Sequence, residues 1–217
     1  MRAEEFWQEI GPAGGAEPPF PASFPATLPD GRTLELPIRA VPDSENGIAS
    51  LIINQASFAV QRELIDCLAA ALIPLRPEVV VGLPTLGLTV AAGLAAALGH
   101  SRYVPFGTSR KFWYDEALSV SMSSVTTPTS RRLYLDPRLL PLLANQRVVL
   151  VDDVLSTGRS AAAGLALLDR VGVRPAAIGA LMLQTERWRT ALGVDAPPVV
   201  GVFATPLLHR TAEGWRP

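Results

Sequence analysis

Short apolar runs alternate with helical patterns across most of this chain, and this alternation constrains the fold more than any other feature. The runs lack a polar residue at every second position, which predicts strands that are buried on both faces. Strands of this kind belong to a parallel sheet with helices on both sides. The predicted buried strands are Glu78–Leu83, Arg147–Val151, Ala176–Leu183 and Val199–Phe203.

Helices are predicted where apolar residues recur at helical spacing. Ser57 is the expected N-cap of the first helix, and Pro74 ends it. The other predicted helices are Leu86–Leu98, Pro137–Leu143, Thr157–Val171 and one or two turns within Glu186–Leu192. Further strands are predicted at Arg32–Ile38, Tyr103–Phe106 and Arg131–Leu135. The expected fold class is therefore α/β, with ligands bound beyond the carboxyl ends of the parallel strands.

Composition limits the partners of this chain. It has 217 residues, 48% of them hydrophobic, which is enough to fill the core of one compact domain. Its formal net charge of -1 gives no general attraction to nucleic acid or anionic membranes, so neither is an expected partner. Leu86–Leu98 is too short to span a bilayer, and the acidic N-terminus does not resemble a secretory signal. A lone cysteine, Cys67, favours a reducing compartment, and we expect the cytoplasm.

Two irregular segments interrupt the alternation. Residues 1–30 are rich in proline and are predicted to form an extended arm, which leaves residues 31–217 as a single domain. The polar stretch Gly107–Ser130 is longer than a simple connection needs, which predicts a functional loop or a protruding hairpin. Three aromatic residues in this stretch are expected either to cover a ligand or a neighbouring subunit, or to pack on the protein itself; they are Phe112, Trp113 and Tyr114.

The segment VVLVDDVLSTGRS, residues 148–160, offers the clearest chemistry. Asp152 and Asp153 follow an apolar strand and can accept hydrogen bonds from two adjacent ribose hydroxyls. A serine- and glycine-containing loop then leads into a helix, whose free backbone N–H groups and dipole favour a phosphate. The alternative is that the aspartates only form a turn and the loop only caps the helix. The two halves in this order favour a site for ribose 5-phosphate.

This segment resembles the PRPP (5-phosphoribosyl 1-pyrophosphate) signature of type I phosphoribosyltransferases, in which two acids follow an apolar strand and precede T-G-x-[ST]. The resemblance implies a five-stranded parallel sheet with helices on both faces and a small hood built from residues 31–54 and 205–217. It also implies that Asp152 and Asp153 bind the ribose hydroxyls. The implied 5-phosphate-binding residues are Ser156, Thr157, Gly158, Arg159 and Ser160.

Two further parts of the chain are similar to that family. Pro84, Thr85, Leu86 and Gly87 stand where the family holds pyrophosphate through backbone amides, although the loop lacks the basic residue that many members have there. The alternative is a tight turn from strand to helix. Arg110 and Lys111 resemble a basic pair on a loop that closes over pyrophosphate, and the alternative is a solvated surface pair.

The resemblance implies a Mg²⁺-dependent enzyme that transfers the phosphoribosyl group of PRPP to a nucleobase and acts as a homodimer. No metal ligand is expected directly from the protein, because Mg²⁺ can be held by substrate oxygens. Val154 and Leu155 are expected to line the base pocket, and Trp215 is a candidate for stacking on the base. A purine is the favoured acceptor.

Three alternatives stay open at this point. The first is an orotate-type pyrimidine enzyme, because the stretch GIASLIINQASF is faintly similar to a substrate loop of those proteins. The second is a non-catalytic PRPP sensor of the same fold, which fold alone does not exclude. The third is a phosphate-binding protein of another doubly wound family, in which the two aspartates bind magnesium like those of receiver domains.

Overall fold

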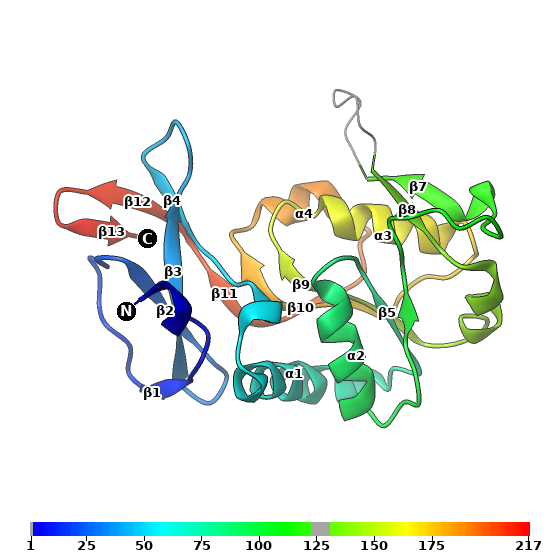
Figure 1. The fold of residues 1–217 in the computed structure, drawn as a ribbon, viewed down its shortest axis with the longest axis horizontal. Helices are drawn as coiled ribbons and strands as arrows, with labels where there is room; N and C mark the ends of the chain where they lie inside the picture. Colours follow the sequence, from blue (N-terminus) through cyan, green and yellow to red (C-terminus); the bar gives the residue numbers. More distant parts are fainter. Residues whose placement is uncertain (1, 123–130) are drawn as a thin grey trace.

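The computed structural model describes residues 2–122 and 131–217, which form two main sheets and a hairpin. A parallel sheet is covered by helices on both faces, and an antiparallel sheet lies beside it (Figure 1). The parallel sheet has the order β11–β10–β9–β5–β6. Its strands are β5 (Val79–Gly82), β6 (Val104–Pro105), β9 (Val148–Leu155), β10 (Ala177–Gln184) and β11 (Val199–Thr205).

The central strands of this sheet are apolar because both of their faces are covered. Residues Val148 to Val151 of β9 are all buried, and β9 pairs in parallel with β5 on one side and β10 on the other. The expected α/β fold with five parallel strands is therefore confirmed. One boundary differs from the prediction, since β9 does not end at Val151 but continues through Asp152 and Asp153 to Leu155. Continued pairing with β10 holds these polar residues in the strand.

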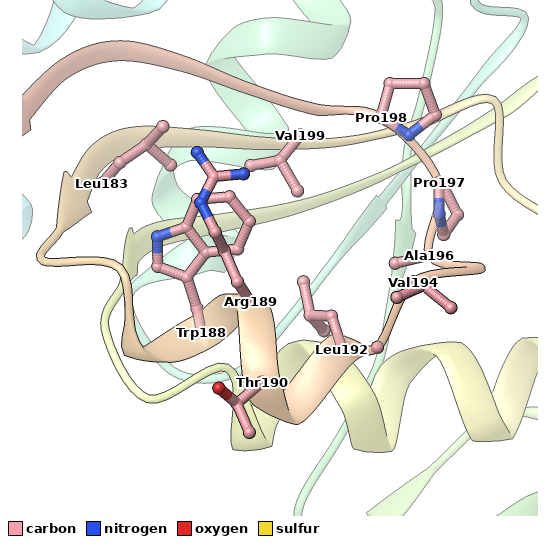
Figure 2. Close-up of a pocket in the computed structure, with 11 residues that line it drawn as sticks. Leu183, Trp188, Arg189, Thr190, Leu192, Val194, Ala196, Pro197, Pro198 and Val199 are labelled. Atoms are coloured by element: carbon pink, nitrogen blue, oxygen red, sulfur yellow. The ribbon is translucent and has the colours of Figure 1, made fainter.

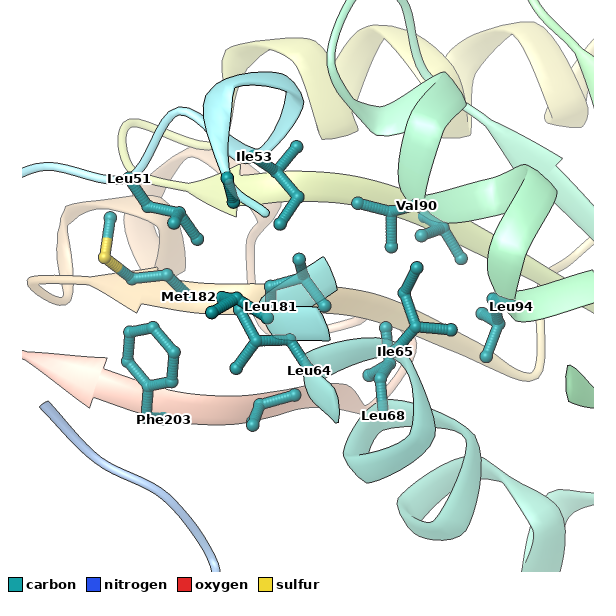
Figure 3. Close-up of a cluster of buried hydrophobic side chains, with 14 of the residues drawn as sticks. Leu51, Ile53, Leu64, Ile65, Leu68, Val90, Leu94, Leu181, Met182 and Phe203 are labelled. Atoms are coloured by element: carbon teal, nitrogen blue, oxygen red, sulfur yellow. The ribbon is translucent and has the colours of Figure 1, made fainter. Parts of the chain in front are cut away.

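Within the described residues, four α-helices cover the two faces of the parallel sheet, two on each (Figure 1). They are α1 (Phe58–Leu72), α2 (Gly87–Ala97), α3 (Arg159–Asp169) and α4 (Arg187–Leu192). The first two bury their apolar residues against one face, where Leu64, Val90 and Leu181 belong to one cluster (Figure 3). The hydroxyl of Ser57 accepts a hydrogen bond from the backbone N–H of Val60, so the predicted N-cap of α1 is confirmed.

The antiparallel sheet combines both ends of the chain, and both termini lie on this side of the molecule (Figure 1). Its strands are β1 (Gly11–Ala13), β2 (Ser23–Thr27), β3 (Arg32–Ala40), β4 (Asn46–Ala49), β12 (Leu207–Thr211) and β13 (Gly214–Arg216). We call it the hood sheet. The predicted hood segments supply four of these strands. The predicted arm supplies the other two, because β1 and β2 pair with β3.

The long polar stretch forms a hairpin in its described part. β7 (Ser119–Ser121) pairs in an antiparallel manner with β8 (Arg132–Tyr134), and residues 123–130 lie outside the described residues. The described part of the chain also contains five short 3-10 helices: Ala3–Glu5, Ile53–Gln55, Ile73–Leu75, Glu116–Leu118 and Pro137–Leu142. Among the described residues, no helix has both the length and the apolar character that crossing a membrane requires.

Candidate functional site at the carboxyl edge of the parallel sheet

The two aspartates lie side by side at the carboxyl end of β9. Asp152 and Asp153 are 8% and 9% exposed, and neither forms an ion pair with another described residue, which is unusual for buried acids. The backbone N–H of Asp153 donates to Oδ1 of Asp152 over 3.0 Å. Burial and the neighbouring charge of Asp153 raise the pKa of Asp152 well above its ordinary value, and burial also raises the pKa of Asp153.

These raised pKa values indicate that the acid pair lacks partners that stabilise its negative charge. A carboxylate that is removed from water is stabilised by hydrogen-bond donors or by a cation. Two adjacent hydroxyls of a ribose would supply two donors to the pair. The buried acids are therefore chemically suited to accept hydrogen bonds from hydroxyl groups, and their predicted role in ribose binding stays a prediction.

The loop Pro84–Gly87 lies directly against the acid pair. It follows β5, and the backbone N–H of Leu83 donates to the carbonyl of Val151 over 2.9 Å. A Cβ added to Gly87 would lie 2.7 Å from Oδ1 of Asp152 and 2.9 Å from its Cα, so only glycine permits this approach. The peptide bond between Pro84 and Thr85 is cis. Tertiary structure thus brings together two loops that are far apart in the sequence.

The loop Ser156–Ser160, which we call the cradle, leads into the start of α3. Gly158 is the N-cap residue and has a left-handed backbone with φ of 77°. A Cβ there would lie 3.0 Å from the backbone of Trp188, so α4 supports the loop from behind. The first N–H groups of α3 have no partner within the helix and can bind an anion.

Gln184, which the sequence analysis missed, connects this cradle to the hood sheet. Its carboxamide oxygen accepts a hydrogen bond from the Ser156 hydroxyl over 2.7 Å, and its nitrogen donates to the carbonyl of Ala49 over 2.7 Å. Gln184 is only 5% exposed. A polar residue at the carboxyl end of a buried strand was the available signal. Thr205 of β11 is paired with Gln184 of β10. The hydroxyl of Thr205 is buried and has no hydrogen-bond partner among the described residues.

The basic pair lies on the loop after β6, where the structure gives it no contact with the acids. Nε of Arg110 is 3.3 Å from Oε2 of Glu116, and Lys111 is exposed. Glu116 also lies 3.4 Å from Arg132. The described conformation thus places Arg110 in a surface ion pair.

Two of the three aromatic residues beside the basic pair pack on the protein itself, and the third is exposed. Nε1 of Trp113 donates to Asp136 over 3.3 Å, and the Tyr114 ring lies beside that of Tyr134, with 6.1 Å between their centroids. These two residues contact the protein itself. Phe112 is 94% exposed.

The predicted base-pocket residues differ in their surroundings. Val154 is half-buried, whereas Leu155 is 2% exposed and packs in the cluster beneath α3. Trp215 is 7% exposed, lies against Gly47 and is covered by the Arg210 guanidinium at 5.1 Å. Its ring faces are therefore occupied within the hood sheet, and the structure does not support stacking of this residue on a base.

A cavity of about 590 Å³ lies elsewhere, beside α4 and the start of β11 (Figure 2). Trp188, Arg189 and Val199 point into it from these elements. None of the acids and none of the cradle residues lines it. This cavity contains neither the buried carboxylates nor the N-terminus of α3, so we place the candidate site at the acid pair and not in the cavity.

The acid pair is also the part of the chain that fits a divalent cation. Carboxylate oxygens are the hard donors that Mg²⁺ prefers, and Asp152 and Asp153 present them on adjacent residues. Within the described residues, no group of three His, Cys, Asp or Glu side chains is placed to hold a metal ion. The donors present thus suit a cation that shares its coordination sphere with a substrate.

Comparisons with known proteins agree with this geometry. The family model described as phosphoribosyl transferase domain matches residues 48–200. The adenine phosphoribosyltransferase of Carboxydothermus hydrogenoformans is 32% identical over 131 residues, which cover 60% of this chain and 72% of the relative. That of Rhodospirillum centenum is 29% identical over 155 residues, 67% of this chain and 83% of the relative.

A solved structure has a similar fold. The adenine phosphoribosyltransferase of Rhodothermus marinus superimposes with a TM-score of 0.60 at 25% identity, over 77% of this chain and 94% of that chain. The matched family region contains the acid pair, the phosphate cradle and the Pro84–Gly87 loop. The chain therefore belongs to the phosphoribosyl transferase domain family.

Proposed function

We propose that this phosphoribosyltransferase transfers the 5-phosphoribosyl group of PRPP to a purine base, with Mg²⁺ as its cofactor and release of pyrophosphate. The observation that carries the proposal is the meeting of three groups at one edge of the parallel sheet. They are the buried pair Asp152–Asp153, the cradle Ser156–Ser160 and the loop Pro84–Gly87. Adenine is the first base to test, because relatives at 32% and 29% identity are adenine phosphoribosyltransferases.

The residues act by holding the sugar phosphate while one bond is exchanged for another. The bond between C1 of the ribose and the pyrophosphate oxygen breaks, and its electron pair leaves with pyrophosphate. A base nitrogen bonds to C1, and the proton of that nitrogen is released to solvent. Asp152 and Asp153 accept hydrogen bonds from the ribose hydroxyls, and the cradle binds the 5-phosphate. Bound Mg²⁺ would neutralise charge on the pyrophosphate. Catalysis then comes from orientation and electrostatic stabilisation.

The base lies, in this proposal, beyond the carboxyl end of β9 and faces the hood. Val154 is half-buried and would contact the base, while buried Leu155 would support the pocket from beneath. The homodimer and the cytoplasmic location expected from the resemblance remain predictions.

The test is to incubate the protein with PRPP, Mg²⁺ and single bases, and to measure pyrophosphate release. The panel contains adenine, hypoxanthine, guanine, uracil and orotate. We expect release with a purine, and with adenine at the highest kcat/KM. Release with orotate alone would replace the purine proposal with the pyrimidine alternative.

A PRPP sensor without catalysis is the second candidate, and one observation favours it. The loop Pro84–Gly87 contains no basic residue, and Arg110 is paired with Glu116 rather than with the acid pair. Without a basic side chain at that end, no side chain stabilises the additional charge that develops on departing pyrophosphate, which favours binding without catalysis. Clear PRPP binding by calorimetry, together with no turnover on any base, would establish the sensor instead.

A further inference from the structure

One cation lies beside the phosphate cradle without belonging to the sequence motif. Arg187 is the first residue of α4 and is exposed. Its Nη2 is 3.4 Å from Oγ of Ser156, and its Nε is 3.4 Å from Oγ1 of Thr185. Both contacts are long for hydrogen bonds, so they hold the guanidinium near the cradle without using its full donor capacity.

The Ser156 hydroxyl has a fixed role beside Arg187. The Gln184 nitrogen donates to the Ala49 carbonyl, so the Gln184 oxygen must be the acceptor of the bond from Ser156. The single hydroxyl proton of Ser156 is thus directed to Gln184. The hydroxyl oxygen of Ser156 is left to accept the contact from Arg187.

The charge of Arg187 is available to a ligand. It forms no ion pair among the described residues, whereas Arg189, two positions later, pairs with Glu186 over 3.2 Å and lies over the Trp188 ring. The nearby cation of the motif is Arg159, which is exposed at the start of α3. A phosphate monoester carries close to two negative charges at neutral pH. A second arginine would supply the matching charge and several N–H donors in a fixed plane.

We propose that Arg187 is a further 5-phosphate-binding residue, held beside the cradle by Ser156 and Gln184. This inference rests on the proposed function and names a residue outside the signature segment. Gln184 is a positioning residue in this arrangement, because it contacts Ser156 and the hood strand β4 but not the cradle opening. The turn after β10 therefore contributes to substrate recognition.

The experiment measures binding of ribose 5-phosphate and of PRPP with Mg²⁺ by calorimetry, so that it does not depend on turnover. The variants are Arg187→Ala and Arg187→Lys, with Arg189→Ala as the matched control on the same helix. We expect Arg187→Ala to weaken the binding of both ligands about 10-fold or more, because a charged hydrogen bond is lost. Arg187→Lys should weaken binding less, because lysine keeps the charge and part of the hydrogen bonding. Arg189→Ala should bind as the wild type does.

Two further readouts separate phosphate binding from a merely structural role. The salt dependence of binding should become shallower in Arg187→Ala, because one cation fewer contacts the phosphate. The KM for PRPP should rise while kcat changes little, since the 5-phosphate does not react. Melting temperatures close to that of the wild type would show that the exposed position tolerates the changes.

The outcomes are distinguishable from a failure of the proposed function. If the wild type binds ribose 5-phosphate or PRPP and Arg187→Ala binds both within twofold of it, the inference is overturned and the proposed function stands. If the wild type binds neither ligand, both fall together. Equal losses of affinity in Arg187→Ala and Arg189→Ala would also overturn the inference, because they would reflect the net charge of the protein and not a contact of Arg187 with the phosphate.

Discussion

The two ends of the proposed site are built in different ways. At the 5-phosphate end, a helix N-terminus, a left-handed Gly158 and the contacts among Gln184, Ser156 and Arg187 are formed by the protein itself. At the pyrophosphate end, the loop Pro84–Gly87 offers backbone groups only, and Arg110 lies in an ion pair with Glu116. The end that binds the part of the substrate that does not react is thus preorganised. At the end that receives the leaving group, Arg110 must first separate from Glu116.

This difference has an energetic meaning. Preorganised contacts at the phosphate bind the ground state and the transition state alike, so they lower KM. Charge at the leaving group develops in the transition state, so a cation that reaches it acts mainly on kcat. For Arg110 to act there, its surface ion pair must open. An exposed pair of this kind contributes on the order of 0–1 kcal/mol, so its opening is not a large barrier.

The largest effect is expected at the junction of the two ends. Asp153→Asn removes a charged acceptor from the ribose hydroxyls, and kcat/KM for PRPP should fall by roughly 100-fold, as charged hydrogen bonds of this strength imply. Steady-state kinetics with varied PRPP measure the effect. Asp169→Asn at the exposed end of α3 is the control and should retain activity. A fall below threefold in Asp153→Asn would remove the acid pair from the site.

The phosphate end can be broken through its backbone. Gly158→Ala places a Cβ 3.0 Å from the Trp188 backbone at φ of 77°, so the loop must move. We expect about 1–3 kcal/mol less stability and about 10-fold weaker PRPP binding, measured by denaturant unfolding and calorimetry. Gly99→Ala is a matched control, since φ there is 78° but nothing lies within 4 Å of the new Cβ. It should lose stability without losing affinity. Equal binding in both variants would contradict a preorganised cradle.

The pyrophosphate end should show the opposite kinetic pattern. Arg110→Ala is expected to lower kcat by about 10-fold and to leave the KM for PRPP nearly unchanged, because the lost contact forms with the leaving group. Glu116→Gln, which releases Arg110, should not lower kcat. The exposed Arg102 supplies the control variant Arg102→Ala. A change in KM alone would mean that the two ends do not differ in the way described.

The smallest effect concerns stability and pH. The pKa of Asp152 is raised in the folded state, so the folded protein binds its proton more tightly than the unfolded chain does. The stabilisation from this group is complete below the ordinary pKa of 3.8 and is lost as pH rises toward the raised value. Asp152→Asn should therefore be more stable than the wild type at neutral pH, by on the order of 1 kcal/mol or more.

Thermal unfolding from pH 3 to pH 8 measures this difference. The stability gain of Asp152→Asn over the wild type should shrink as pH falls toward 4. The variant should lack activity at every pH. Parallel curves for Asp152→Asn and the wild type would show that Asp152 does not titrate as its burial implies.

The sequence predicted most of the parallel sheet, because strands buried on both faces are apolar whatever lies beside them. The order of strand, acid pair, loop and helix in residues 148–169 was predictable for a similar reason, since these are consecutive residues and need no distant partner. The prediction erred on the end of β9, where pairing with β10 carries two acids into the strand. The strands of the arm were not predicted, because β1 and β2 are strands only through their pairing with β3.

Contacts between distant parts of the chain were decided by tertiary structure alone. The sequence determined that Asp152, Asp153 and the cradle form one unit, since backbone geometry sets their spacing. It did not determine that Gly87 would lie against Asp152, that Gln184 would join Ser156 to Ala49, or that Arg187 would lie beside the cradle. These contacts depend on strand order and register in the folded sheet, which bring the ends of β5, β9 and β10 to one edge. No spacing along the chain encodes that proximity.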